Sequence, residues 1–177
     1  MPVSADVLRT HLDYSAWASR RLLDAIAELP AEDLTRDFQT AEHSVLGTLA
    51  HIFYADRSWL WRLSGGEDPG GLKDSDRSLA VLQADWPAIQ ERWRLWAADL
   101  TDDQAAAMLD YRDRRGNPYR QPVWQLIFHV VNHGTHHRGQ VSGFLRAMGH
   151  VPPVLDLVDY YRQMAKRAAG GSSHYRP

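Results

Sequence analysis

Residues 132–140 read NHGTHHRGQ, and a further histidine, His129, lies one helical turn before them. The surrounding segment has the pattern of a helix, so we expect all four histidines to lie on one helix. A helix brings residues four positions apart onto the same face, and His133 and His137 can therefore direct two ring nitrogens at one point. Neutral imidazole is the commonest metal ligand among protein side chains. The stretch therefore predicts half of a metal site, completed from another helix.

Apolar side chains recurring every three to four residues predict four long helices and one short helix. The predicted helices cover residues 4–29, 44–63, 78–100, 122–148 and 156–164. Ser44 is a suitable N-cap for the second helix, whereas Pro87 predicts a kink or a later start in the third. Residues 31–41 form a connector with one turn, and residues 108–120 form a small hairpin or an irregular arm.

We therefore predict an all-α fold, a four-helix bundle with an extra short C-terminal helix. Residues 1–167 form a single domain, and residues 168–177 form a flexible tail rich in Gly and Ser. The chain has 7 tryptophans. Trp59, Trp93, Trp96 and Trp124 are expected to pack in the core, although some can line a pocket or a dimer surface.

The composition excludes several classes of protein. The formal net charge is −2 and the basic residues are scattered among acids, so we expect no nucleic-acid partner. No apolar run approaches the roughly 20 residues of a membrane span, and the first residues lack the pattern of a signal peptide. The sequence contains no cysteine, so thiolate zinc sites and thiol nucleophiles from the chain itself are excluded. We expect a cytoplasmic protein whose metal ligands are His, Asp or Glu.

His51 is the best candidate for the third ligand. It lies in the middle of the second predicted helix among apolar residues, where a buried imidazole needs partners for both nitrogens. A histidine in such a place is usually a core residue, but the histidine cluster on a neighbouring helix favours a ligand. Geometry alone leaves open whether His133 pairs with His137 or with His129, and His136 points away from His137. The remaining histidines are expected to lie outside the site: His11, His43, His150 and His174.

The chain resembles the DinB/YfiT-like superfamily, and most closely its DinB branch. The motifs that carry the resemblance are YSAWA (residues 14–18), LAHI (49–52), N-H-x-T-H-H-R-G-Q-V (132–141), GHVPP (149–153) and DLVDY (156–160). The resemblance extends from about residue 8 to residue 162. The chain departs from the family at Ala18 or Ser19, where relatives often carry Asn.

The resemblance implies an up-down-down-up helix order and a metal site. In similar proteins three histidines bind a divalent ion, nickel or zinc, and water fills the open positions. Carried over by motif, these ligands are His51, His133 and His137, with His129 and His136 in supporting roles. The family tendency also implies a homodimer.

A three-histidine site with open positions suits a metal-dependent enzyme. We expect either a hydrolase or an S-transferase that uses a low-molecular-weight thiol, because relatives include thiol transferases. The alternative is a non-catalytic metal-binding or stress-response protein with a structural or sensory metal. Asp56 is either a general base or, more simply, a partner of Arg57 or Arg62. Arg138 and Gln140 either orient ligands or form buried pairs.

Overall fold

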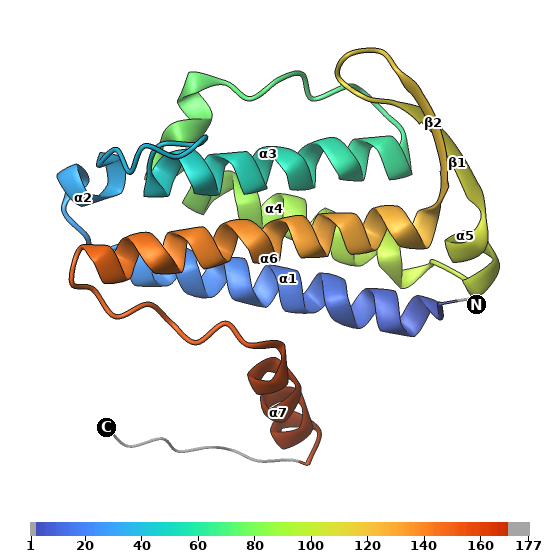
Figure 1. Cartoon of the computed structure of the whole chain (residues 1–177). Helices are drawn as coiled ribbons and strands as arrows, with labels where there is room; N and C mark the ends of the chain where they lie inside the picture. The colour runs from blue at the N-terminus through green and yellow to red at the C-terminus, as the bar shows by residue number, and fades with distance from the viewer. Residues whose placement is uncertain (1–2, 170–177) are drawn as a thin grey trace.

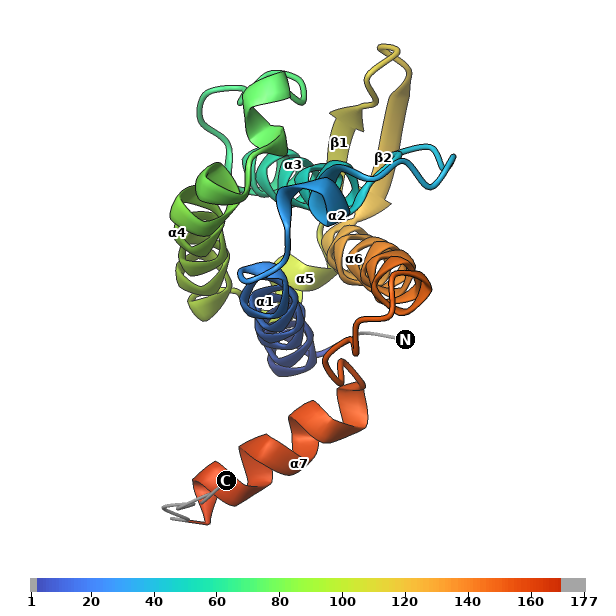
Figure 2. The same ribbon diagram turned by 90° about the vertical axis from the view of Figure 1, so that its left-hand side faces the viewer.

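Four long helices build the molecule. The computed structural model describes residues 3–169, in which the long helices are α1 (Ala5–Ile26), α3 (Val45–Ser64), α4 (Leu79–Ala98) and α6 (Val123–Ala147). Each packs against two others, so that α1 lies between α4 and α6, and α3 closes the ring from the opposite side (Figures 1 and 2). All four begin and end within three residues of the predicted limits.

Shorter elements connect the long helices. They are α2 (Ala31–Thr35), the 3-10 helix η1 (Asp74–Arg77), α5 (Asp102–Ala106), β1 (Met108–Arg112), β2 (Pro118–Pro122) and α7 (Leu157–Ala168). The two strands form an antiparallel hairpin in which Met108 is opposite Pro122 and Arg112 is opposite Pro118. The hairpin rises from the start of α6 and leans over α3 (Figure 1). Of the two forms predicted for this arm, the hairpin is confirmed.

The core lies between the four long helices and is formed by side chains that are almost fully buried. It includes Leu8, Leu22 and Ile26 of α1, Leu49, Ile52 and Phe53 of α3, Leu82 and Trp86 of α4, and Ile127, Val130 and Val141 of α6. These positions recur at helical spacing, which is why the periodic pattern located the helices correctly.

The helix ends agree with the sequence in part. The Ser44 hydroxyl accepts a hydrogen bond from the Gly47 backbone N–H, as an N-cap does, and Gly65 follows α3 with a φ of 77°. Asp156 occupies the N-cap position of α7 but its side chain forms no capping bond. Pro87 neither starts nor interrupts α4, which runs through it from Leu79.

The C-terminal boundary requires a correction. Helix α7 continues to Ala168, so the residue at which we placed the start of the flexible tail is helical. Helix formers such as Met164 and Lys166 extend the helix beyond the apolar stripe. Residues 170–177, including His174, lie outside the described residues.

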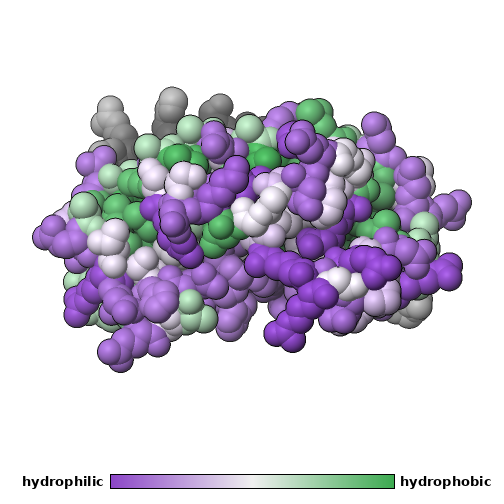
Figure 3. Space-filling view, turned by 90° about the horizontal axis from the view of Figure 1, so that it is seen from above, coloured by the Kyte–Doolittle hydropathy of each residue, from purple (hydrophilic) through white to green (hydrophobic). Residues whose placement is uncertain are grey.

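The outer surface is largely polar. The face that carries η1, the loop that precedes it and the hairpin turn is mostly hydrophilic, with small separate apolar areas (Figure 3). None of the helices in residues 3–169 combines the length and hydrophobicity that a membrane crossing requires.

Candidate metal centre

Three half-buried histidines converge where two helices pack against each other. His51 lies in the middle of α3, and His133 and His137 lie one turn apart on α6, which packs against α3. One nitrogen of each ring lies within 4.8 Å of the other two. The Nε2 atoms of His51 and His133 are 3.0 Å apart. Two imidazole nitrogens bound to one ion at roughly 2.0–2.1 Å lie roughly 3.0–3.4 Å apart, so this pair fits a shared metal.

Two of the three rings also contact a polar side chain through their Nδ1 atom, on the side away from the converging nitrogens. The Nδ1 atom of His51 lies 3.2 Å from a carboxylate oxygen of Glu42, and Nδ1 of His137 lies 2.7 Å from Oε1 of Gln140. Because carboxylate and amide oxygens are acceptors, each contact places the ring proton on Nδ1 and leaves the Nε2 lone pair free. Such outer contacts typically orient metal-binding histidines. The donor set therefore fits a divalent cation.

The surroundings keep all three rings neutral. Burial, together with the smaller effect of the neighbouring histidines, lowers the pKa of His133 to about 3. Burial also lowers the pKa of His51, although Glu42 opposes this effect, and the pKa of His137, although Gln140 and Glu42 oppose it. A metal ligand must be deprotonated, so these shifts favour metal binding over protonation at neutral pH.

The other two histidines of the cluster lie beside the site. The ring of His129 packs on Trp59, with 5.2 Å between ring centroids, and its centroid is 5.8 Å from that of His133. The exposed ring of His136 packs edge-on against His137. Neither belongs to the group whose nitrogens converge, so the structure brings together His133 with His137 rather than His129 with His133.

Three of the four histidines expected to lie outside the site do so, and the fourth, His174, is not among the described residues. His11 packs edge-on against Phe128 rather than lining the site, and His43 is exposed near Asp37. His150 pairs with Asp33, its Nε2 lying 2.8 Å from the carboxylate.

A cavity of about 350 Å³ adjoins the histidines. It is bounded by α3, by α6 and by the hairpin, and its lining includes His51 and His133. The other lining side chains are Tyr54, Ala55, Ser58, Trp59, Arg62, Tyr111, Asp113, Arg114 and Tyr119. Its volume falls in the range of small-molecule sites. The histidine cluster is therefore within reach of a small ligand.

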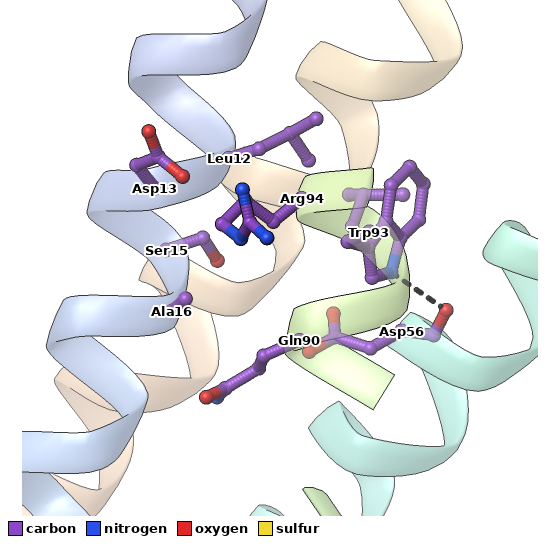
Figure 4. Close-up of a pocket in the computed structure, with 9 residues that line it drawn as sticks. Leu12, Asp13, Ser15, Ala16, Asp56, Gln90, Trp93 and Arg94 are labelled. Carbon is purple, nitrogen blue, oxygen red and sulfur yellow. Dashed lines mark hydrogen bonds between the residues drawn. The ribbon is translucent and has the colours of Figure 1, made fainter. Parts of the chain in front are cut away.

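Asp56 has a different role from either of those predicted. Its carboxylate accepts a hydrogen bond from Trp86 Nε1, and its backbone carbonyl accepts one from Trp93 Nε1. It lines a separate cavity of about 20 Å³ between α1, α3 and α4 (Figure 4). The lining of this cavity includes none of the histidines. Arg57 pairs with Asp76 instead. Asp56 is five residues after His51, a spacing that turns it to another face of α3.

Each of the two roles predicted for Arg138 and Gln140 is found in one of them: Arg138 forms buried hydrogen bonds, and Gln140 orients a histidine. The almost fully buried guanidinium of Arg138 donates to the hydroxyl oxygens of Ser15, Ser19 and Thr135. It therefore joins α6 to α1 through Ser15 and Ser19. Gln140, by contrast, orients the ring of His137.

Sequence reasoning missed Glu42, which lies in the loop before α3. The backbone of His43 has a φ of 61°, and this left-handed turn places Glu42 over the first turn of α3. A Cβ on Gly47 would collide with the Glu42 carbonyl, so only glycine allows this approach. The glycine three residues after Ser44 is the one signal in the sequence for this contact.

Comparison with known proteins gives consistent matches. The sequence model of the DinB family matches residues 1–168. The chain is similar to Protein DinB of Bacillus subtilis (strain 168), with 24% identity over 152 residues that cover 81% of this chain and 87% of that protein. Its fold is similar to the crystal structure of a DinB-like protein from Bacillus cereus ATCC 10987, with a TM-score of 0.63 and 21% identity. That match covers 87% of this chain and 99% of the other.

Proposed function

The chain belongs to the DinB family. We propose that it binds a divalent metal ion, nickel or zinc, and that it is an enzyme whose activity depends on this ion. The proposed ligands are Nε2 of His51, His133 and His137. The observation that carries the proposal is the convergence of three neutral ring nitrogens within 4.8 Å beside a cavity. A structural metal site usually has four protein ligands, whereas a catalytic site leaves a position open. Three converging ligands among the described residues favour the catalytic kind.

The reaction we propose is transfer to or from the sulfur of a low-molecular-weight thiol. A divalent ion bound there would act as a Lewis acid and lower the pKa of a bound water or thiol. The chain has no cysteine, so a thiol must come from a small molecule. Hydrolysis usually also needs a general base. The one carboxylate that lines the cavity, Asp113, is held by backbone N–H groups of its own turn, which favours the thiol reaction over hydrolysis.

The chain's own residues would then have simple tasks. Glu42 and Gln140 hold the Nδ1 protons and fix the directions of two rings. Trp59 and Tyr111 form an apolar wall at the cavity that limits the access of water. We also propose that residues 1–167 act as one domain, that the helices follow the family's up-down-down-up order, and that the protein is a homodimer.

Metal binding is tested first, by titrating the purified protein with Ni²⁺ or Zn²⁺ and measuring retained metal after dialysis. We expect about one ion per chain in the parent. His133→Ala and His137→Ala should each lose stoichiometric binding while circular dichroism shows the same helix content. His136→Ala is the matched control, because it removes an exposed ring of the same helix. Retained metal in both ligand variants would refute the assignment.

The reaction is tested by a screen of the Ni²⁺- or Zn²⁺-loaded protein with several low-molecular-weight thiols and electrophiles. We expect the thiol to be consumed by the metal-loaded parent, but not by the metal-free protein or by His133→Ala. Turnover of ester or amide substrates without thiol would instead favour a hydrolase. Stoichiometric metal without turnover of either kind would favour the non-catalytic alternative, a structural or sensory site.

A further inference from the structure

Two arginines line the cavity beside the histidines. Arg62 lies on α3, with its guanidinium carbon 4.9 Å from the centroid of Trp59. Arg114 lies in the hairpin turn, with its guanidinium carbon 4.0 Å from the centroid of Tyr54. An arginine stacked on an aromatic face keeps its N–H edge available for hydrogen bonds. Helix α3 and the hairpin turn thus place two positively charged side chains at the same cavity.

Neither guanidinium is neutralised by the part of the chain that the structure describes. Arg57 pairs with Asp76, Arg94 with Glu91 and Arg162 with Asp159. Among residues 3–169, no carboxylate oxygen lies within 4.0 Å of a guanidinium nitrogen of Arg62 or Arg114.

The one carboxylate in the lining is already occupied. Asp113 accepts hydrogen bonds from the backbone N–H groups of Arg115 and Asn117 and from the Asn117 side chain. These bonds fix the hairpin turn and lower the pKa of Asp113. The carboxylate therefore stabilises the turn that carries Arg114, and the cavity keeps an excess of positive charge.

The remaining wall is aromatic. Trp59 packs edge-on against Tyr111, with 5.3 Å between ring centroids, and Tyr111 stacks on Tyr119 at 5.6 Å. Flat aromatic surfaces bind flat apolar groups, and a guanidinium fork binds a carboxylate with two parallel hydrogen bonds. The same cavity offers both surfaces next to the three histidines.

We propose that this cavity binds an organic carboxylate with an aromatic body, the anionic group at Arg62 and Arg114 and the ring against Trp59 and Tyr111. The inference rests on the proposed function, because it names the substrate class of the same site. It does not require the metal for binding of the anion, so the two proposals can fail separately.

The test uses 3-phenylpropionate as the probe and 3-phenylpropanamide as its neutral counterpart, with binding measured by calorimetry on metal-free full-length protein. We expect the acid to bind and the amide to bind at least about tenfold more weakly, as for loss of hydrogen bonds to charged groups. Arg62→Gln and Arg114→Gln should each weaken binding of the acid by a similar factor. Arg115→Gln, the neighbouring arginine outside the lining, should bind like the parent.

Three results would overturn the proposal. They are equal binding of acid and amide, absence of acid binding, and acid binding unchanged in both arginine variants. Phenyl phosphate is a further arm, and a phosphate that binds where the carboxylate does not would assign the cavity to another anion. Repeating the titration on His133→Ala separates the two proposals, because that variant lacks the proposed metal site but keeps both arginines. Metal loss with unchanged acid binding would support both.

Discussion

Glu42 and Gln140 contact two of the three converging histidines and would act on the proposed metal centre through them. Removing such outer partners typically costs about 10–100-fold in metal affinity. We therefore expect Glu42→Ala and Gln140→Ala each to weaken Zn²⁺ binding by about that factor, measured by competition with a chelating dye. Glu42→Gln keeps an acceptor for His51 Nδ1 and should recover part of the loss. Asp24→Ala, which removes an exposed carboxylate from α1, should leave the affinity unchanged.

Asp56 makes folding stability depend on pH. Burial raises its pKa to about 6, although the Trp86 hydrogen bond and the Arg138 charge oppose the shift. In the unfolded chain the group titrates near pH 4, so between about pH 4 and pH 6 the folded state holds a proton that the unfolded state lacks. The contribution is therefore fully present at low pH and is lost as the pH rises through 6.

Asp56→Asn should remove this dependence. The amide oxygen can still accept from Trp86, and the side chain cannot ionise. We expect the variant to be more stable than the parent at pH 7 by on the order of 1–3 kcal/mol, with the difference shrinking toward pH 4. Urea unfolding at several pH values measures it. Parallel pH profiles for the two proteins would contradict the assignment.

Two of the three glycines of helix α6, Gly134 and Gly139, have opposite environments. A Cβ on Gly134 would lie 2.7 Å from the Arg138 guanidinium, which Ser15 and Ser19 hold in place, whereas a Cβ on Gly139 would meet no atom within 4 Å. Gly134→Ala should therefore destabilise the fold by about 1–3 kcal/mol through overpacking. Gly139→Ala should stabilise it by about 0.5–1 kcal/mol through helix propensity. Thermal unfolding of the matched pair checks both signs.

At this scale the sequence predicts regular elements well and loop geometry poorly. The positions of α3 and α6 follow from local periodicity and caps, and the spacing of His133 and His137 fixes their common face. The contact of Glu42 with His51 depends instead on a left-handed backbone at His43, which no local preference demands. Likewise, Arg114 reaches the cavity because of the register of the hairpin, which the polar residues of this arm do not determine.

The whole molecule brings its functional groups together at the junction of α3, α6 and the hairpin, which are far apart along the chain. The histidines could be paired in advance because the family resemblance supplied what geometry left open between His129 and His137. No comparable motif marks the cavity wall, because in the sequence Trp59 and Tyr111 cannot be distinguished from aromatic residues that pack in the core. Long-range packing therefore decided what the sequence left open.

Helix α7 is the element from which we argue assembly. Tyr160 packs against Tyr14 and Trp17 of α1, and Gln163 accepts a hydrogen bond from Trp17 Nε1, while the C-terminal part of the helix extends away from the four long helices (Figure 2). Its other side exposes Val158, Tyr161 and Met164, each more than 40% accessible and three residues from the next. Residues at this spacing are neighbours on a helix surface. An apolar stripe of this kind is the surface that a second copy would cover in the proposed homodimer.

Val158→Glu together with Met164→Glu should convert the dimer into a single species of 20.2 kDa, measured by light scattering. Burying two carboxylates in an apolar interface costs several kcal/mol, more than most modest interfaces can supply. Ala80→Glu adds a negative charge to an exposed site on α4 and should leave the dimer intact. A parent protein that is already monomeric at high concentration would contradict the homodimer, and a variant that remains dimeric would move the interface away from α7.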